Sequence, residues 1–395
     1  MEPVIGMDIS KGNSVIQAFL RRNEPYGKAE QIYHNEQGLE RLSTLCTELK
    51  ARTGTEPVVI MEATGHYHRG LVCYLAREEI RHIILNPLQS KRAKGMGLRK
   101  VKTDEADAWN LVEMFYRGDA LPHRIWDEAY MELQHATRQH EFVTSLYVQA
   151  KLNTRALLDQ VIPAYEGVFS DLYSATSLEV LQSCLQGQMD EVEIIEKVLI
   201  KHAGRSRSQS WIREKSIRLE EVLRKWKEGW ASPSQTAALK GMVALRFPFQ
   251  AQLKQLEQQM EEISVHLPEV HLLKSIPGIG EKLAAAIVAE IGDIRQYRHA
   301  KQLVAYAGLD PSVYSSGKFT ASSNRITKRG SKRLRRSLYL AVQCGLRQGS
   351  NRRLVSYYER KKKEGKPYKV TVIACANKLL HHIYAILNRG QPYQA

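Results

Sequence analysis

Four carboxylates in this chain have the spacing of a metal-binding site. Asp8 lies inside a short apolar run near the start of the chain, and Glu62 closes a second apolar run. Asp104 and Asp107 begin a helix-like stretch, and a separation of three residues places both on one helical face. Four converging acids would repel one another unless a hard cation, Mg²⁺ or Mn²⁺, neutralises them. Such a cation would then polarise a phosphodiester.

The two helical acids also have a simpler explanation. The helix macrodipole favours acids in a first turn, and Thr103 is a suitable N-cap for Asp104 and Asp107. The sequence leaves both explanations open for this pair. The structural alternative is weaker for Asp8 and Glu62, because an acid in a buried strand needs a specific partner.

The elements that position these acids alternate between strand and helix. An α/β domain with a mixed sheet follows, in the order of a ribonuclease-H-like (RuvC-like) fold. Glu62 would stand at the carboxyl end of a central strand, where open α/β sheets bind their ligands. The patterns predict strands over 4–10, 14–20, 31–34, 57–62 and 81–86, and helices over 36–52 and after residue 103.

The positive charge is concentrated in the last third of the chain. Residues 269–395 contain 24 Lys and Arg against 7 Asp and Glu, whereas residues 1–268 contain 34 against 35. This asymmetry predicts a nearly neutral catalytic domain over 1–125, a helical linker over 126–268 and a phosphate-binding domain over 269–395.

Composition excludes several other classes of protein. No apolar run approaches the roughly 18 residues of a membrane span, and the mean hydropathy is −0.39. We therefore expect a soluble, cytoplasmic protein without a membrane partner. The five cysteines are scattered singly and contain no C-x-x-C pair, so neither a disulfide framework nor a zinc site is expected.

A basic segment precedes the helical acids. It has six cations in twelve residues and two glycines, which favour a loop over a helix. A solvated charged loop is a common alternative, but its position beside the acids favours contact with a nucleic-acid backbone. The predicted contacts are Lys91, Arg92, Lys94, Arg99, Lys100 and Lys102.

The middle of the chain has a helical period. Apolar residues recur in steps of three and four from Ala129 to Val161 and from Leu253 to Leu267. Two long antiparallel helices that pair as a coiled coil are therefore expected. His140 lies on this seam and is predicted to be a polar core position rather than a ligand. Residues 165–235 are predicted to form an inserted helical subdomain of open role.

The mainly α-helical C-terminal domain begins with a candidate helix-hairpin-helix. Its turn, Pro-Gly-Ile-Gly at residues 277–280, lies between two short amphipathic helices. Backbone N–H groups around Gly278 and Gly280 could hold a DNA phosphate at a helix N-terminus. The alternative is an ordinary tight turn.

A segment rich in serine and cations follows. A hydroxyl surrounded by cations is suited to attack on phosphorus, because the cations bind the phosphate and stabilise the transition state. On composition alone, a Ser/Gly loop in a basic surface is the simpler explanation. The candidate hydroxyls are Ser312, Ser315, Ser316, Ser322 and Ser323, and the candidate phosphate-binding cations are Lys318, Arg325, Lys328, Arg329, Lys332 and Arg333.

Short motifs in a fixed order give the chain a family resemblance. It resembles the IS-one-ten insertion-sequence transposases, which are related to the Piv/MooV invertases, and the match leaves only the middle insertion uncovered. The motifs are Gly6-Met7-Asp8, Met61-Glu62-Ala63-Thr64-Gly65, Asn86-Pro87, residues 102–108, residues 275–280, residues 307–311, Ser316-Gly317 and Lys328-Arg329-Gly330.

This resemblance implies a mechanism. It implies a DEDD catalytic domain in which Asp8, Glu62, Asp104 and Asp107 hold Mg²⁺, with Mn²⁺ as a substitute. It makes Ser316 the nucleophile that links covalently to DNA. It further implies donor and target DNA, a noncoding bridge RNA, and homo-oligomers, a dimer and a tetramer on DNA, in which the acids of one subunit meet the serine of another.

Two other functions compete with RNA-guided transposition. A RuvC-like Holliday-junction nuclease would use the same acids with a metal-activated water and no covalent step. A non-catalytic RNA-binding protein derived from such an enzyme would not need the acids, so the presence of all four disfavours it.

Overall fold

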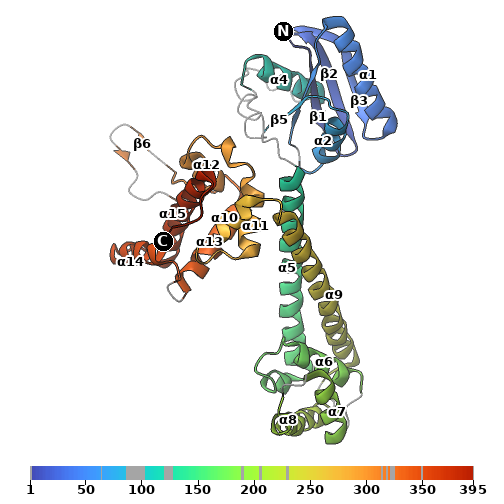
Figure 1. Ribbon diagram of the computed structural model, residues 1–395. Coiled ribbons are helices and arrows are strands. Elements are labelled where there is room, and N and C mark those ends of the chain that lie inside the picture. The colour runs from blue at the N-terminus through green and yellow to red at the C-terminus, as the bar shows by residue number, and fades with distance from the viewer. Residues whose placement is uncertain are drawn as a thin grey trace. The chain divides into compact units, whose positions relative to one another are not determined.

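The computed structural model divides the chain into two compact units, Met1–Ile125 and Trp126–Ala395, here called the N-terminal and C-terminal units. Figure 1 shows the elements of each unit. The structure describes residues 2–63, 65–85, 103–119, 128–187, 191–203, 207–227, 231–312, 315–316, 319–320, 325–347 and 350–394.

The N-terminal unit is built on a mixed five-stranded sheet of order β3-β2-β1-β4-β5. β2 is antiparallel to β1 and β3, whereas β1, β4 and β5 are parallel. This is the arrangement of an RNase-H-like sheet, and it confirms the predicted α/β fold class. The strands are β1 (Val4–Ile9), β2 (Asn13–Arg21), β3 (Glu24–Tyr33), β4 (Val58–Glu62) and β5 (His82–Leu85).

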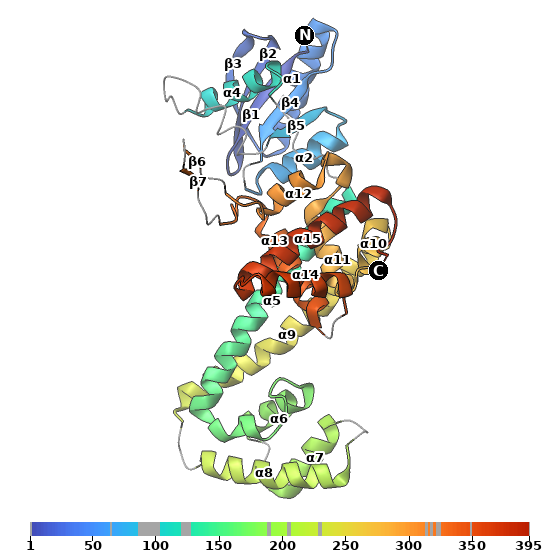
Figure 2. The ribbon, with the colours of Figure 1, turned by 90° about the vertical axis from the view of Figure 1, so that its left-hand side faces the viewer.

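Helices cover both faces of this sheet. α1 (Glu36–Thr53) and α2 (His68–Arg77) bury leucines against one face of the central strands. α4 (Asp104–Tyr116) packs Leu111 and Val112 against Val4 and Ile60 on the other face. Figure 2 shows the sheet and its helices from the side. Because both faces are covered, β1 and β4 are buried along almost their whole length.

β3 begins seven residues earlier than the predicted strand over 31–34. Its side chains are mostly polar and exposed, and it pairs with β2 alone, at the edge of the sheet. An edge strand needs no apolar run, so the hydrophobic pattern marked only its last residues.

Two long helices pair in the C-terminal unit, α5 (Glu128–Val161) and α9 (Pro233–Ser264). Their contacts run in opposite directions along the chain: His140 Nε2 lies 3.2 Å from Glu257 Oε1, and Gln160 Oε1 lies 3.1 Å from Gln235 Nε2. The helices are therefore antiparallel.

The insertion between these helices has a core of its own. Fully buried residues such as Tyr165, Leu181 and Leu199 pack with the adjoining ends of α5 and α9. Its elements are η1 (Pro163–Gly167), α6 (Ala175–Leu185), α7 (Val192–Ala203) and α8 (Gln209–Lys227).

The remaining helices pack around α11, α13 and α15 and against the start of α5. α15 is long and apolar enough to span a membrane, but Val372, Leu380 and Ile383 are fully buried in this core. The elements are α10 (Pro268–Lys274), α11 (Glu281–Ile291), η2 (Ile294–Gln296), α12 (Ala300–Ala307), β6 (Ser315–Ser316), β7 (Phe319–Thr320), α13 (Lys332–Leu346), α14 (Arg352–Lys363) and α15 (Tyr368–Arg389).

Candidate functional site

Asp8 and Glu62 occupy corresponding positions on two neighbouring parallel strands. The register pairs Val4 with Val58 and continues to Met7 with Met61, so the next two residues are Asp8 and Glu62. Both side chains are half-buried, unlike the fully buried residues before them. Because parallel strands end at the same edge of a sheet, the two carboxylates stand together at the carboxyl edge of the central strands.

A glycine brings the third acidic element to the same place. A Cβ atom on Gly6 would lie 2.2 Å from the carbonyl oxygen of Ala108, so α4 crosses β1 with its backbone almost in contact. Gly6 and Asp8 share one face of the strand, since alternate residues point the same way. Asp8 therefore faces the side of the sheet on which α4 lies, and Asp107 immediately precedes the contact residue Ala108.

Glu62 faces the same helix. Ile60, two residues earlier on β4, packs against Leu111 and Val112 of α4. Residues two apart on a strand share a face, so Glu62 lies on the α4 side as Asp8 does. The backbone thus brings acids from β1, β4 and the first turn of α4 to one edge of one face of the sheet.

The first turn of α4 also has the local features of an acidic helix start. Thr103 is the N-cap, and its Oγ1 accepts a hydrogen bond from the Ala106 N–H at 3.2 Å. Asp104, Glu105 and Asp107 all lie in the first turn, where the macrodipole favours negative charge. The acids of this turn therefore fit both explanations, a capped acidic helix start and a position near Asp8, and neither explanation excludes the other.

The chemistry of these donors suits a hard divalent cation, which prefers carboxylate oxygens. Among the residues that the structure describes, however, no three His, Cys, Asp or Glu side chains are grouped closely enough to hold an ion. The backbone therefore brings the acids to one edge, while the side chains are not drawn together into a single set of ligands.

The predicted serine segment rises from a narrow stem between α12 and α13. Two residue pairs close this stem: Thr327 Oγ1 donates to Asp310 Oδ1 at 2.7 Å, and the Ser312 N–H donates to the Arg325 carbonyl at 2.8 Å. β6 and β7 form the outer hairpin, in which Ser316 pairs with Phe319. Ser315 and Ser316 are thus adjacent residues of one strand, whereas Ser322, Ser323 and Lys318 lie outside the described residues.

Glycine also makes the base of this stem possible. A Cβ on Gly330 would lie 1.7 Å from the carbonyl oxygen of Tyr306, and Gly308 has a positive φ of 64°. The Lys328 N–H donates to the Gly308 carbonyl at 3.1 Å, which joins the two sides of the stem.

The cations around this stem fall into two groups. Arg333 Nε lies 2.7 Å from Glu141 Oε2 of α5, and Arg336 Nη1 lies 3.1 Å from the other oxygen of the same carboxylate. One carboxylate of α5 therefore forms ion pairs with two arginines of α13. The second group forms no ion pair with a described residue and is available to phosphate; it consists of Arg325, Lys328, Arg329 and Lys332.

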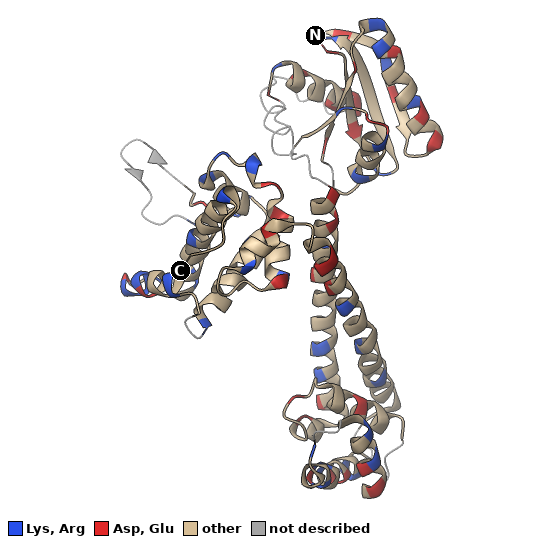
Figure 3. Cartoon of the chain, in the orientation of Figure 1, with Lys and Arg blue, Asp and Glu red and all other residues tan. Residues whose placement is uncertain are grey.

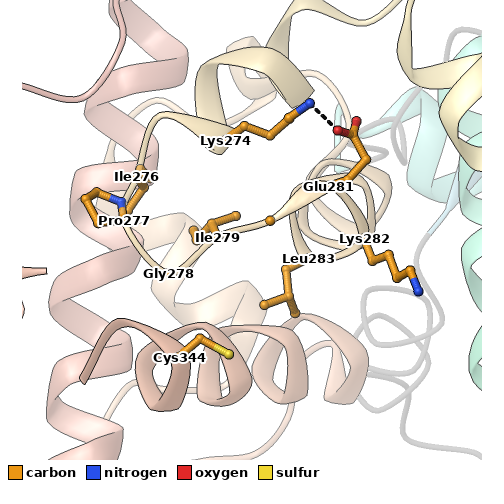
Figure 4. A pocket seen from close by; sticks show the side chains of 10 residues that line it. Lys274, Ile276, Pro277, Gly278, Ile279, Glu281, Lys282, Leu283 and Cys344 are labelled. Carbon is orange, nitrogen blue, oxygen red and sulfur yellow. Dashed lines mark ion pairs between the residues drawn. The ribbon is translucent and has the colours of Figure 1, made fainter. Parts of the chain in front are cut away.

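The hairpin between α10 and α11 is partly enclosed. Gly278 has a φ of 98°, and a Cβ there would lie 2.5 Å from the Cα of Gly345 on α13. Gly280 is exposed and is the N-cap of α11. Figure 4 shows the open hollow that this hairpin lines, with Lys274 and Glu281 forming an ion pair across it. Of the two hairpin glycines, Gly280 is the one that offers exposed backbone at a helix start.

The predicted basic loop contacts Lys91, Arg92, Lys94, Arg99, Lys100 and Lys102 lie outside the described residues. Sequence reasoning gave no role to Gly6 or Glu141. A glycine inside an apolar strand often marks a close backbone approach, so Gly6 carried a usable signal. No local signal could have paired Glu141 with cations almost two hundred residues away.

An RNase-H-like sheet with acids at its carboxyl edge, joined to a basic helical region, defines a class of nucleic-acid-processing proteins. Two family models match the chain: a DEDD transposase domain of the IS110 type at residues 5–163, and the model described as "Transposase IS116/IS110/IS902 family" at residues 270–359. The chain therefore carries transposase domains of the IS110/IS116/IS902 family.

Individual relatives agree with this assignment. An uncharacterized protein of insertion element IS116 from Streptomyces clavuligerus is 24% identical over 97% of this chain and 94% of its own length. The pilin gene-inverting protein of Moraxella bovis is 32% identical over 36% of this chain, and the transposase of IS1111A from Coxiella burnetii is 30% identical over 35%. The matches cover only 45% and 38% of those two relatives, less than half of their lengths.

Proposed function

We propose that this protein cuts and rejoins DNA as the transposase of an insertion sequence and acts in the cytoplasm. The observation that carries the proposal is the register of β1 and β4, which sets Asp8 beside Glu62 under the first turn of α4. The match to the DEDD transposase domain supports the proposal, because that model covers this whole acidic region.

The acids would hold Mg²⁺, or Mn²⁺ in its place, through Asp8, Glu62, Asp104 and Asp107. When bound, the cation polarises the scissile phosphate and neutralises charge that develops there. The half-buried positions of Asp8 and Glu62 suit this role, because each side chain is partly exposed to solvent while the strand that bears it is fixed by the core.

Ser316 would attack the phosphorus atom. A bond forms between its oxygen and phosphorus, a phosphorus–oxygen bond of the DNA breaks, and the serine proton ends on the DNA hydroxyl that leaves. Attack by another DNA hydroxyl reverses these changes and frees the serine. No net phosphodiester is lost, so strands are rejoined without a high-energy cofactor. Arg325, Lys328 and Arg329, which form no ion pair with a described residue, would bind the phosphate.

The proposal includes the partners that the family resemblance implies. A noncoding bridge RNA would pair with donor and target DNA, and a dimer, or a tetramer on DNA, would combine the acids of one subunit with Ser316 of another. The excess of positive charge beyond residue 268 supports contacts with both nucleic acids.

A covalent adduct tests the chemical step. The protein is purified with its co-transcribed RNA and incubated with nicked suicide DNA and Mg²⁺, and protein-linked DNA is sought on a denaturing gel. Ser316→Ala should abolish the adduct, whereas the adjacent Ser315→Ala is the matched control and should retain it. An adduct that persists in Ser316→Ala overturns the nucleophile assignment.

The same assay separates the other parts of the proposal. Cleavage without any adduct would instead favour a junction-resolving nuclease that uses water. Ribonuclease treatment should abolish recombination, and recombination that survives complete removal of RNA overturns guidance. Removal of divalent metal by a chelator should stop cleavage, and added Mg²⁺ or Mn²⁺ should restore it.

A further inference from the structure

A small hollow lies among α13, α14 and α15 and has no part in the chemistry described above. Its volume is about 300 Å³. The C-terminal end of α13, the middle of α14 and the first turn of α15 meet there, so its walls come from three elements. The lining residues are Gln343, Leu346, Arg347, Tyr358 and Tyr368.

Two tyrosines supply its aromatic wall. The rings of Tyr358 and Tyr368 meet edge to face, with 6.5 Å between their centroids and an interplanar angle of 74°. Tyr368 is 53% exposed although its ring is large and apolar. The arrangement leaves an aromatic surface open to a planar ligand, which would gain stacking contact that water does not provide.

The polar groups of the hollow are weakly engaged. Gln343 Nε2 lies 3.4 Å from the hydroxyl of Tyr339 and 3.5 Å from that of Tyr368, both at the long limit of a hydrogen bond. Within the described residues, Gln343 Oε1 accepts no hydrogen bond and Arg347 forms no ion pair. An amide offers a donor and an acceptor, and a guanidinium offers donors. These are the groups that recognise the edge of a nucleobase.

The surrounding charge suits a polyanion. Residues 347–369 contain nine Lys and Arg but only two Glu. Of these acids, Glu364 pairs with Lys361 at 2.8 Å and with Lys366 at 3.7 Å. Figure 3 shows the resulting concentration of basic residues on α14. The cations that remain unpaired among described residues, including Lys362, Lys363 and Lys369, can bind phosphates on either side of a base held in the hollow.

We propose that this hollow binds one unstacked base of a single-stranded stretch of RNA or DNA. The base stacks on Tyr368, Gln343 and Arg347 contact its edge, and the flanking phosphates lie over the basic residues of α14. A duplex is a poor ligand, because its bases are already stacked and paired. This inference deepens the proposed function and rests on it only in that the chain handles nucleic acid.

Binding of labelled oligonucleotides to the full-length protein tests the inference. The probes are an unstructured pyrimidine strand, as RNA and as DNA, and a duplex DNA of the same length. Tyr368→Ala should weaken binding of a single strand by about 5- to 100-fold, as expected for the loss of one base–aromatic stack, and leave duplex affinity unchanged. Tyr368→Phe keeps the ring and should bind normally. Whichever strand type shows the loss is identified as the ligand.

A neighbouring tyrosine provides the matched control. Tyr357 does not line the hollow, and its ring is covered by Arg360, whose Cζ lies 5.0 Å from the ring centroid. Tyr357→Ala should therefore leave single-strand affinity unchanged. Lys362→Ala should lower the salt dependence of binding, whereas Tyr368→Ala should not, because only the lysine releases a counterion.

The inference is overturned if Tyr368→Ala and Tyr358→Ala both bind single strands normally, or if duplex binding falls equally. It is also overturned if Tyr357→Ala has the same effect. The half-exposed Tyr368 is unlike a core residue, and an unchanged melting temperature verifies the fold. Because the readout is binding, failure of this proposal and failure of the proposed function can be told apart. If the natural chain does not recombine DNA, the proposed function is disproved. If Tyr368→Ala still lowers single-strand affinity in that case, the binding site proposed here stands.

Discussion

The acid-bearing sheet and the serine-bearing stem hold their chemical groups in different ways. Asp8 and Glu62 continue a regular parallel ladder, and the core lies directly beneath them. Ser316 instead lies on a two-residue strand that, among the described residues, pairs with β7 alone, beyond a stem closed by Asp310 and Thr327. In the first region the sheet alone sets the geometry, whereas in the second the geometry depends on a few anchoring contacts.

The two regions also differ in how their charges are compensated. In the N-terminal unit, like charges are brought to one edge, which favours an external cation. In the C-terminal unit, Glu141 pairs with Arg333 and Arg336, and the buried Glu290 accepts hydrogen bonds from Arg138 Nε at 2.9 Å and Ser331 Oγ at 2.7 Å. The basic region is thus partly neutralised from within, and only some of its cations are available to nucleic acid.

The largest effect is expected from removing one charge at the sheet edge. Asp8→Asn or Glu62→Gln should lower recombination by at least about 100-fold, since each removes a proposed ligand of the cation. The melting temperature should hardly change, because both side chains are half-buried near the carboxyl end of a strand whose core stays intact. Glu105→Gln is the control. Glu105 is an exposed acid in the first turn of α4, and this variant should retain activity. Equal losses in all three variants would contradict the assignment.

A smaller effect, on stability, is expected from Gly6→Ala. The new methyl group would meet the Ala108 carbonyl at 2.2 Å, so α4 must move away from β1. The cost should be about 1–3 kcal/mol of unfolding free energy, measured by urea denaturation, with a parallel loss of activity as Asp107 is displaced.

Gly70→Ala is the control for this substitution. Gly70 is exposed in α2 with no atom near its Cβ position, and alanine there should stabilise the fold by about 0.5–1 kcal/mol. A Gly6→Ala protein as stable as the natural chain would show that the two backbones are not in close contact.

The smallest effect should come from Glu141→Gln. Exposed ion pairs contribute about 0.2–1 kcal/mol, so freeing Arg333 and Arg336 should raise affinity for DNA by only about 2- to 5-fold. The gain should vanish at high salt, where charges are screened. Glu261→Gln makes the same charge change at an exposed acid without a described ion pair. An equal gain in DNA affinity in Glu261→Gln would show that the effect comes from the change in net charge and not from release of Arg333 and Arg336.

Local hydrophobic patterns predicted the helices and strands, whereas the register between strands shows which residues of different strands are neighbours. The apolar runs located β1 and β4 and placed Asp8 inside the first and Glu62 at the end of the second, but only strand pairing shows that Asp8 and Glu62 are neighbours. The predicted apolar seam from Ala129 to Val161, with its steps of three and four, includes Leu157, whereas the fully buried residue is its neighbour Leu158. A straight helix has 3.6 residues per turn, so a repeat of 3.5 drifts over a helix as long as α5.

Buried charge was the least predictable feature. Arg246 is fully buried in α9, where its guanidinium lies over the rings of Tyr147 and Tyr173, with 5.3 and 4.7 Å to the ring centroids. The surrounding sequence gives no sign of this, because both tyrosines belong to segments more than 70 residues away. Contacts of this kind are set by helix pairing and not by composition.

The antiparallel pairing of α5 and α9 has a consequence for how the length of such a chain can vary. Gln160 and Gln235 are hydrogen-bonded, so the chain enters and leaves the insertion at adjacent points. The segment between them has its own buried core. A segment whose two ends meet can be gained, lost or exchanged without disturbing the register of the helices that bear it. The far end of the helical pair is therefore a place where evolution can add or remove a whole module in one step.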